Sequence, residues 1–422
     1  MKITGYEVYD LRFPTSQQLD GSDAMNPDPD YSAAYVELKT ESTEFVGCGM
    51  TFTIGRGNEL CVEGIRSLAQ LLVGQDVAQL MQQPVEMARK LTSDSQLRWV
   101  GPEKGVIHLS AAAVINAVWD LWAKMQQKPV WRLVYDMSVE QFVSCVDFRY
   151  LTDELNMGQA KELLDSVRDG REERLQHLLD QGYPSYTTSA GWLGYSDEQL
   201  KQKCADLKAR GWNHFKIKVG RDLEDDRRRC GLLRAEMGDD AKMMIDANQV
   251  WDVPEAIQWI QQLAEFNPWF VEEPTFPDDI LGHAAISKAV SPIRVATGEM
   301  CHNRIMFKQF LQAGGMQVCQ IDSCRLGGVN EVLAVLLLAA KSKVPVCPHA
   351  GGVGLCEYVQ HLSMIDYLCV SGTMEDRVTE YSDHLHEHVL HPVIMENGHY
   401  QAPLAAGYSV QFTEEAIRQY QF

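Results

Sequence analysis

The 422-residue chain has the composition of a folded protein, with 45% hydrophobic and 23% charged residues, which argues against a disordered or fibrous chain. Its 38 basic and 58 acidic residues give a net charge of −20. This field repels polyanions, so we expect no nucleic-acid partner, and an anionic substrate must meet a local concentration of positive charge.

The sequence has only weak signals for membrane insertion or export. The longest apolar run, 332–340, is too short to span a bilayer. The first residues, MKITGYEVYD, have neither an apolar signal core nor the character of a transit peptide. The eleven cysteines include no CxxC pair, which is typical of reduced thiols in a chain of this size. We therefore expect a cytoplasmic protein without a membrane segment.

The first 140 residues have an α+β pattern. Alternating stretches at 3–13 and 33–39 predict strands, and the polar, turn-rich segment 17–31 between them predicts a long loop of the kind that often forms a lid. Residues 108–125 are apolar all round, which predicts a buried helix with Trp119 and Trp122 in the core.

The middle of the chain alternates short apolar runs with helical stretches. Seven runs start at positions 185, 214, 242, 269, 294, 318 and 345, and a weaker eighth covers 367–371. This alternation predicts parallel strands, and its number of units favours a closed (β/α) barrel over an open sheet. We assign residues 1–140 to a first domain and 141–383 to the barrel. The less regular segment 384–422 is expected to fold back onto the first domain.

Charged residues recur at the ends of the predicted barrel strands. They lie 23 to 28 residues apart, always at the carboxyl end of a run: Lys218, Asp246, Glu272, Glu299, Asp322 and His349. Catalytic groups in such barrels come from this end of the strands, so the regularity predicts an active site.

Three of these residues are carboxylates on consecutive strands. Asp246, Glu272 and Glu299 would repel one another unless a cation neutralised them. An all-oxygen set of ligands suits a hard ion, and Mg²⁺ comes before Mn²⁺ or Ca²⁺.

Two acid–base groups flank these carboxylates. Lys216 and Lys218 are two residues apart on a strand and face the same way. Near a divalent ion, each disfavours the charged form of the other, so either could serve as a neutral base near pH 7. On the other side, Asp322 would orient His349 as a proton carrier. A metal between two such groups suits removal of the proton alpha to a carboxylate.

The same residues carry a resemblance to a known family. KIKVG, MIDAN, VEEP, ATGE and PHAGGVG resemble the enolase superfamily, in its mandelate-racemase-type branch with a KxK motif and a His–Asp dyad. Further segments, among them RFPTS, DPDYSAAYV, LRWVGPEKG and QIDSCRLGGVNE, resemble the L-fuconate dehydratase family.

This resemblance implies a modified TIM barrel with an α+β N-terminal capping domain, whose lid shapes specificity. It implies an acid-sugar substrate, a homo-oligomer and a dehydratase reaction that uses Mg²⁺. It implies that Lys218 is the base and that Lys216 assists it electrostatically. It implies that the metal ligands are Asp246, Glu272 and Glu299, and that His349, oriented by Asp322, is the acid on the departing β-hydroxyl. It also implies that Asn248 and Glu380 contact the substrate or its enediolate. By position, Ser22, Asp23 and Tyr31 in the lid and Tyr186 on the first barrel strand are further candidate contacts of the sugar.

Other functions remain open on sequence alone. The same groups would serve a racemase, or a dehydratase of another aldonate or aldarate. A class I aldolase would not need the three carboxylates. A non-catalytic binding homologue would be expected to lack one of these residues, and none is missing. The cluster HLHEHVLH, with His384, His386, His388 and His391, does not match HExxH, so we assign it structural or surface roles.

Overall fold

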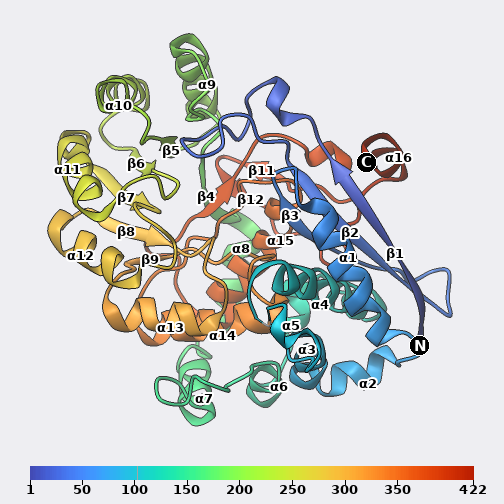
Figure 1. Cartoon of the computed structure of the whole chain (residues 1–422). Coiled ribbons are helices and arrows are strands. Elements are labelled where there is room, and N and C mark those ends of the chain that lie inside the picture. Colours follow the sequence, from blue (N-terminus) through green and yellow to red (C-terminus); the bar gives the residue numbers. More distant parts are fainter. Residues whose placement is uncertain (102) are drawn as a thin grey trace.

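The computed structural model describes residues 1–101 and 103–422; Pro102, within the segment LRWVGPEKG, lies outside the described residues. Figure 1 shows the N-terminal strands and helices gathered on one side of a ring of parallel strands surrounded by helices. This arrangement confirms the predicted (β/α) barrel with an α+β capping domain.

The cap is a three-stranded antiparallel sheet covered by helices. The strands pair in the order β1-β2-β3. Its elements are β1 (Ile3–Arg12), β2 (Ser32–Thr40), β3 (Gly47–Thr53), α1 (Asn58–Ala69), α2 (Val77–Gln82), α3 (Pro84–Thr92) and α4 (Gly105–Met125).

Helix α4 forms the core of the cap. Its backbone approaches β3 so closely that a Cβ at Gly49 would overlap the carbonyl oxygen of Ala113. Trp119 is fully buried, and its indole nitrogen donates a hydrogen bond to Asn330 Oδ1 at 2.8 Å, whereas Trp122 is partly buried against the core. Among the described helices, α4 alone is long and apolar enough to cross a membrane by length and composition, but 83% of its most apolar window is buried inside the protein.

Four short helices lead from the cap to the barrel, and the barrel units follow. The linking helices are α5 (Val130–Tyr135), α6 (Val139–Ser144), α7 (Met157–Ser166) and α8 (Arg171–Gln181). The barrel comprises β4 (Tyr183–Thr187), α9 (Asp197–Ala209), β5 (His214–Lys218), α10 (Leu223–Met237), β6 (Lys242–Asp246), α11 (Val253–Leu263), β7 (Pro268–Glu272), α12 (Ile280–Val290), β8 (Arg294–Thr297), α13 (Arg304–Ala313), β9 (Val318–Cys319), α14 (Gly328–Lys341), α15 (Leu355–Ile365) and β10 (Thr379–Tyr381).

The seventh and eighth strands close the ring, but the eighth lies where the sequence did not predict it. Val346 bridges Cys319 of β9, and β10 pairs in parallel with β4. The predicted run 367–371 belongs instead to a π-helical segment (Asp366–Ser371) that continues from α15. A short buried apolar run does not distinguish a strand from a buried helical turn, and here it is a helical turn.

Side chains that point into the barrel form an apolar layer beneath a polar one. The apolar layer contains Tyr186, Met244, Phe270, Ala296, Val318, Cys347 and Val378. Two residues further along each strand, and therefore on the same face, the inward positions include Asp246, Glu272, Gln320, His349 and Glu380. The polar layer lies at the carboxyl ends of the strands, where barrel enzymes place their active sites.

Two outer segments complete the fold. In the loop between β1 and β2, the Ser22 backbone oxygen accepts a hydrogen bond from Leu193 N (3.0 Å), so this loop lies against the loop that follows β4. The C-terminal segment contains β11 (Met395–Glu396), β12 (His399–Tyr400) and α16 (Glu414–Tyr420). β12 pairs with β4, and Gln421 bridges Leu11 of β1, so this segment contacts both the barrel and the cap.

Candidate active site

A cavity of about 410 Å³ lies between the cap and the carboxyl ends of the barrel strands. The cap contributes the predicted lid residues Asp23 and Tyr31 together with Met25, Phe52, Ile54 and Arg56. The barrel contributes Lys218, Asn248, Glu299, Asp322, His349 and Glu380. Six of the ten predicted barrel residues therefore line one cavity. Lys216, Asp246 and Glu272 are buried beneath it, and Tyr186 belongs to the apolar layer.

Strand register brings the charged residues of neighbouring strands to one level. Lys218 pairs with Asp246 across β5 and β6, and Asp246 pairs with Glu272 across β6 and β7. Lys218 Nζ lies 2.6 Å from Asp246 Oδ2 and 2.9 Å from Asn248 Oδ1. Lys216 Nζ lies 2.7 Å from Glu272 Oε1, 2.9 Å from Glu380 Oε1 and 3.2 Å from Asp246 Oδ2.

The protonation of the two lysines differs from the sequence expectation. Burial lowers the pKa of Lys218, and so does Lys216, but Asp246, Asp23 and Glu272 together raise it above its ordinary value. The pKa of Lys216 is likewise raised, because Glu272, Glu380 and Asp246 outweigh its burial. The prediction of a neutral lysine rested on the two ammonium groups next to a divalent ion; it did not weigh the carboxylates, which raise both pKa values here.

The carboxylate cluster carries excess negative charge. Burial raises the pKa of Glu272 well above its usual range, and the neighbouring Asp246, Glu380 and Glu299 carboxylates raise it further in spite of Lys216. Burial and the same kind of repulsion raise the pKa of Glu273, whose Oε1 is buried without a hydrogen-bond partner. An all-oxygen set at the ends of adjacent strands with surplus negative charge fits a hard divalent cation.

The three proposed metal ligands do not yet surround one point. No three histidine, cysteine, aspartate or glutamate side chains in the described part of the chain are arranged to hold a metal ion. The Lys216 ammonium lies between Asp246 and Glu272, and Glu299 Oε2 lies 3.4 Å from His349 Nε2. Protein cations therefore occupy the positions next to these carboxylates, and small side-chain movements would be needed for the three to share an ion.

The predicted histidine–aspartate pair is formed. His349 Nδ1 lies 2.9 Å from Asp322 Oδ2, while Asp322 Oδ1 accepts hydrogen bonds from the backbone nitrogens of Cys324 and Arg325, each at 2.7 Å. Burial lowers the pKa of His349, but Glu299, Asp322 and Glu380 raise it to about 9. The imidazole is thus held as a proton donor at neutral pH.

Glu380 lies between the two acid–base groups. Its Oε1 accepts hydrogen bonds from Thr188 Oγ1 (2.7 Å) and contacts Lys216, and its Oε2 accepts one from Ala350 N (2.9 Å). Although burial raises the pKa of Glu380, Lys216, His349 and Lys218 lower it to about 2. Glu380 is therefore an ionised group that links the lysine side of the site to His349.

Two of the predicted sugar contacts do not reach the cavity. Ser22 is buried, and its Oγ accepts a hydrogen bond from Gly194 N at 2.9 Å, so it fixes the lid to the barrel. Tyr186 belongs to the apolar layer, with its ring 5.3 Å from Lys216 Nζ and edge-on to Phe270. Both were chosen by chain position, which does not reveal where a side chain points.

Three residues around the site were not predicted. Gln320 Nε2 donates to Glu272 Oε2 at 2.7 Å; it is two residues before Asp322 on the same strand face, so the period of two was an available signal. Arg325 lines the cavity and donates through Nε to the Glu299 backbone oxygen (3.2 Å). Trp192, in the loop after β4, lines the cavity with its ring 5.5 Å from Lys218 Nζ.

The backbone is strained beside the carboxylates. Asn248, Gln249 and Glu273 have φ values of 45°, 68° and 43°, in the left-handed region that non-glycine residues rarely adopt. Gln249 N donates to the Glu273 backbone oxygen at 2.7 Å, and Gln249 Nε2 donates to Glu273 Oε2 at 2.7 Å. Such strain persists where surrounding contacts fix the chain, and it is concentrated at functional sites.

The histidine cluster has structural contacts. His384 stacks on Tyr31 with ring centroids 5.6 Å apart, and His386 Nδ1 lies 2.8 Å from Glu357 Oε1. His388 stacks on Phe13 at 5.0 Å. These contacts join the C-terminal segment to the cap and the barrel.

Comparisons with known proteins agree with this geometry. Residues 28–134 match the family described as mandelate racemase / muconate lactonizing enzyme, N-terminal domain, and residues 199–416 match the enolase C-terminal domain-like family. The chain is 56% identical to mitochondrial enolase superfamily member 1 of Xenopus laevis, over all of this chain and 95% of that protein. It is 54% identical to L-galactonate dehydratase of Hypocrea jecorina, over all of this chain and 94% of that protein.

Solved structures show the same relationship. The crystal structure of human mitochondrial enolase superfamily member 1 superimposes with a TM-score of 0.98 at 54% identity, covering all of this chain and 96% of that one. The structure of L-talarate/galactarate dehydratase from Salmonella typhimurium shares the fold, with a TM-score of 0.77 at 22% identity. The chain therefore belongs to the enolase superfamily, in its mandelate racemase and muconate lactonizing enzyme branch.

Proposed function

We propose that this enzyme is a Mg²⁺-dependent hydro-lyase that dehydrates a six-carbon acid sugar, with L-fuconate as substrate and 2-keto-3-deoxy-L-fuconate as product. The observation that carries the proposal is the placement of two proton-transfer groups, Lys218 and His349, on either side of the carboxylates at the floor of one cavity. Dehydration of this kind needs one group to remove a proton and another to supply one.

The chain's own residues account for each proton. Lys218, once deprotonated, takes the proton from the carbon alpha to the substrate carboxylate, and the electron pair of that C–H bond forms the enediolate. Lys216 lies beneath the same region and supplies positive charge to the developing oxyanion. Asn248 Oδ1 lies 2.9 Å from Lys218 Nζ and orients it.

The second step breaks the bond to the β-hydroxyl. His349, held by Asp322, donates its proton to that hydroxyl, which leaves as water while the enediolate electrons form the carbon–carbon double bond. The resulting enol tautomerises to the 2-keto-3-deoxy acid, so the overall change is the loss of one water molecule.

Asp246, Glu272 and Glu299 are the residues that would hold the Mg²⁺ ion. The ion would supply Lewis-acid charge that binds the substrate carboxylate and stabilises the enediolate. The raised pKa of Glu272 supports this assignment, because burial and its carboxylate neighbours both oppose its ionisation without further positive charge.

The cap wall favours a substrate with an apolar distal end. Five of its cavity residues are apolar: Met25, Pro29, Phe52, Ile54 and Leu109. L-Fuconate ends in a methyl group, whereas L-galactonate has the same configuration with a hydroxymethyl group at that carbon. L-Galactonate is the second candidate, because a relative that is 54% identical over the whole chain carries that activity in its name. Discrimination by one such group is expected to be modest, about 10- to 100-fold in kcat/KM.

The test is turnover of five- and six-carbon aldonates and aldarates by purified protein with Mg²⁺, read as 2-keto acid after carbonyl derivatisation. We expect keto acid from L-fuconate, a lower kcat/KM with L-galactonate, and loss of both after EDTA treatment with recovery on adding Mg²⁺. Turnover of another acid alone would contradict the substrate. If no acid is dehydrated but α-protons exchange in D₂O, the enzyme is a racemase instead. Silence in both assays would favour a binding protein.

A further inference from the structure

A buried carboxylate outside the cavity joins the two loops that carry the acid side of the site. Glu331 lies in the first turn of α14 and is 6% exposed. Its Oε2 lies 2.6 Å from Gly327 N and 2.6 Å from His108 Nε2. Its Oε1 accepts hydrogen bonds from both the backbone nitrogen and the guanidinium of Arg304, each at 3.0 Å.

Two partners of Glu331 lie at the ends of the loops that carry Glu299 and Asp322. Arg304 begins α13, five residues after Glu299, and Gly327 ends the loop after β9, which contains Asp322. Inside the cavity, Arg325 of that second loop donates to the Glu299 backbone oxygen at 3.2 Å. The loops after β8 and β9 are therefore connected twice, by Arg325 at the front and by Glu331 at the back.

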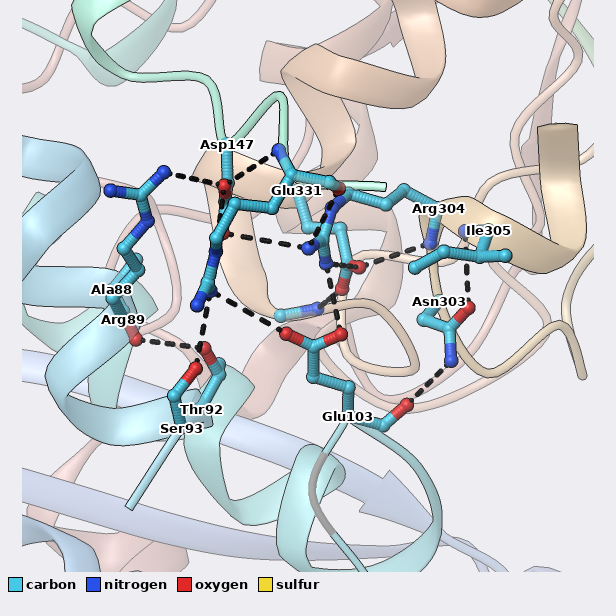
Figure 2. A network of polar contacts seen from close by, with 12 residues as sticks. Ala88, Arg89, Thr92, Ser93, Glu103, Asp147, Asn303, Arg304, Ile305 and Glu331 are labelled. Carbon is cyan, nitrogen blue, oxygen red and sulfur yellow. Dashed lines mark hydrogen bonds and ion pairs between the residues drawn. The ribbon is translucent and has the colours of Figure 1, made fainter. Parts of the chain in front are cut away.

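The same network reaches the cap, as Figure 2 shows. Arg304 contacts Glu103 at 3.2 Å and Asp147 at 3.4 Å, and Asp147 also pairs with Arg89 of α3 at 2.7 Å. Asn303 Nδ2 donates to the Glu103 backbone oxygen at 2.8 Å. His108, on α4, brings the central cap helix to Glu331.

We propose that Glu331 is a positioning residue for the dehydration: it fixes the separation of the loops after β8 and β9 and locks the cap against them. A buried charge is costly, and a hydrophobic side chain would often stabilise such a position equally well. What the carboxylate adds is four directed contacts, to both loops and to the cap. Glu331 would influence the reaction by fixing the distance between Glu299 and the Asp322–His349 pair. In this respect the inference rests on the proposed function.

Asp120 offers a matched control. It is a buried carboxylate on α4 that accepts hydrogen bonds from Cys48 N (2.8 Å) and Tyr408 N (2.7 Å) and pairs with Lys124 at 2.7 Å. It resembles Glu331 in burial and in its partners, but it joins β3 to the C-terminal segment and contacts neither catalytic loop.

The experiment compares Glu331→Ala, Glu331→Gln and Asp120→Asn with the wild type, at a temperature where all four are folded by circular dichroism. We expect all three variants to lower Tm. Only Glu331→Ala should lower kcat strongly, by about 10- to 100-fold with KM changed less than about 3-fold, because displacement of a reacting group by about 1 Å has effects of this size. Glu331→Gln, which retains an acceptor oxygen, should recover part of kcat, and Asp120→Asn should keep it within about 2-fold.

Hydrogen–deuterium exchange provides a readout that does not depend on the substrate. In Glu331→Ala, exchange should rise in residues 299–304 and 322–327, and in Asp120→Asn it should not. Full kcat in Glu331→Ala, or an equal loss of kcat in Asp120→Asn, would overturn the inference. If the wild type dehydrates no acid sugar, the proposed function fails. In that case hydrogen–deuterium exchange alone tests the inference, and unchanged exchange of the two loops in Glu331→Ala would overturn it.

Discussion

Two groups of buried charge lie on opposite sides of the same loops, and they are balanced differently. In the network around Glu331, each carboxylate faces a cation of the chain: burial raises the pKa of Glu331, but His108 and Arg304 lower it to about 2. In the barrel, burial and neighbouring carboxylates raise the pKa of Glu272 well above its usual range. In the first group the cations of the chain stabilise the ionised carboxylate, whereas in the second the ionised form of Glu272 is disfavoured unless a further cation binds. This difference, more than burial or the number of charges, separates a structural network from a binding site.

The largest effect is expected from Lys218→Ala, which removes the base from the unbalanced group. Turnover should fall by about 10⁴-fold, the upper range for loss of a general base. The fold should persist, because Asp246 keeps its contact with Lys216. Steady-state kinetics with the true substrate, alongside a thermal unfolding curve, checks this. Near-normal turnover would show that Lys218 is not the base.

His349→Asn should separate the two halves of the reaction. Dehydration should fall by about 10²- to 10³-fold, because the leaving hydroxyl loses its proton donor. Exchange of the substrate α-proton with D₂O should fall much less, because Lys218 performs that step. Proton NMR of the substrate in D₂O measures exchange beside product formation. Equal losses of both activities would assign His349 to proton abstraction as well.

Acid should weaken the balanced group. The folded-state pKa of Glu331 is below its ordinary value of 4.5, so its contribution to stability is present above about pH 4.5 and is lost as the pH falls towards 2. The difference in free energy of unfolding between wild type and Glu331→Gln should therefore shrink by about 2 kcal/mol between about pH 6 and pH 3. Urea unfolding at several pH values measures it, and a constant difference would contradict the assigned contacts.

The smallest effect is expected on the surface. Arg228 is about half exposed and pairs with Asp197 and Asp225. Exposed pairs contribute little, so Arg228→Ala should change the free energy of unfolding by less than about 1 kcal/mol and leave turnover unchanged. A larger loss of stability in a urea titration would contradict this, because it would show that the exposed ion pairs of Arg228 contribute more than such pairs ordinarily do.

The charged strand ends could be predicted because the barrel repeats itself. Asp246 and Glu272 follow apolar runs at a regular spacing, and the pairing of β6 with β7 turns that spacing into proximity. The eighth strand was missed because β10 has only three residues with Glu380 at its centre, whereas the run at 367–371 is apolar but helical. Glu380 itself entered the prediction through the family resemblance.

Contacts between distant segments carried no signal in the sequence. His108 and Glu331 are 223 residues apart. His108 begins the predicted helix 108–125 and Glu331 ends the segment QIDSCRLGGVNE, but neither feature indicates that the two side chains meet. The raised pKa of Lys218 was missed because the sequence argument weighed the neighbouring Lys216, whereas in the fold Asp246 and, from the lid, Asp23 raise that pKa. The regular spacing of the repeat therefore located the charged strand ends, whereas contacts between distant segments could not be read from the sequence.

The pairing of the last residues with β1 has a consequence for engineering. Phe422 N donates to the Asp10 backbone oxygen at 2.8 Å, and the Arg12 guanidinium lies 3.8 Å from the centre of the Phe422 ring. The barrel sequence is thus enclosed between two stretches of chain that meet in the cap sheet. A chimera that exchanges caps between relatives therefore needs two junctions, one before the barrel sequence and one after it.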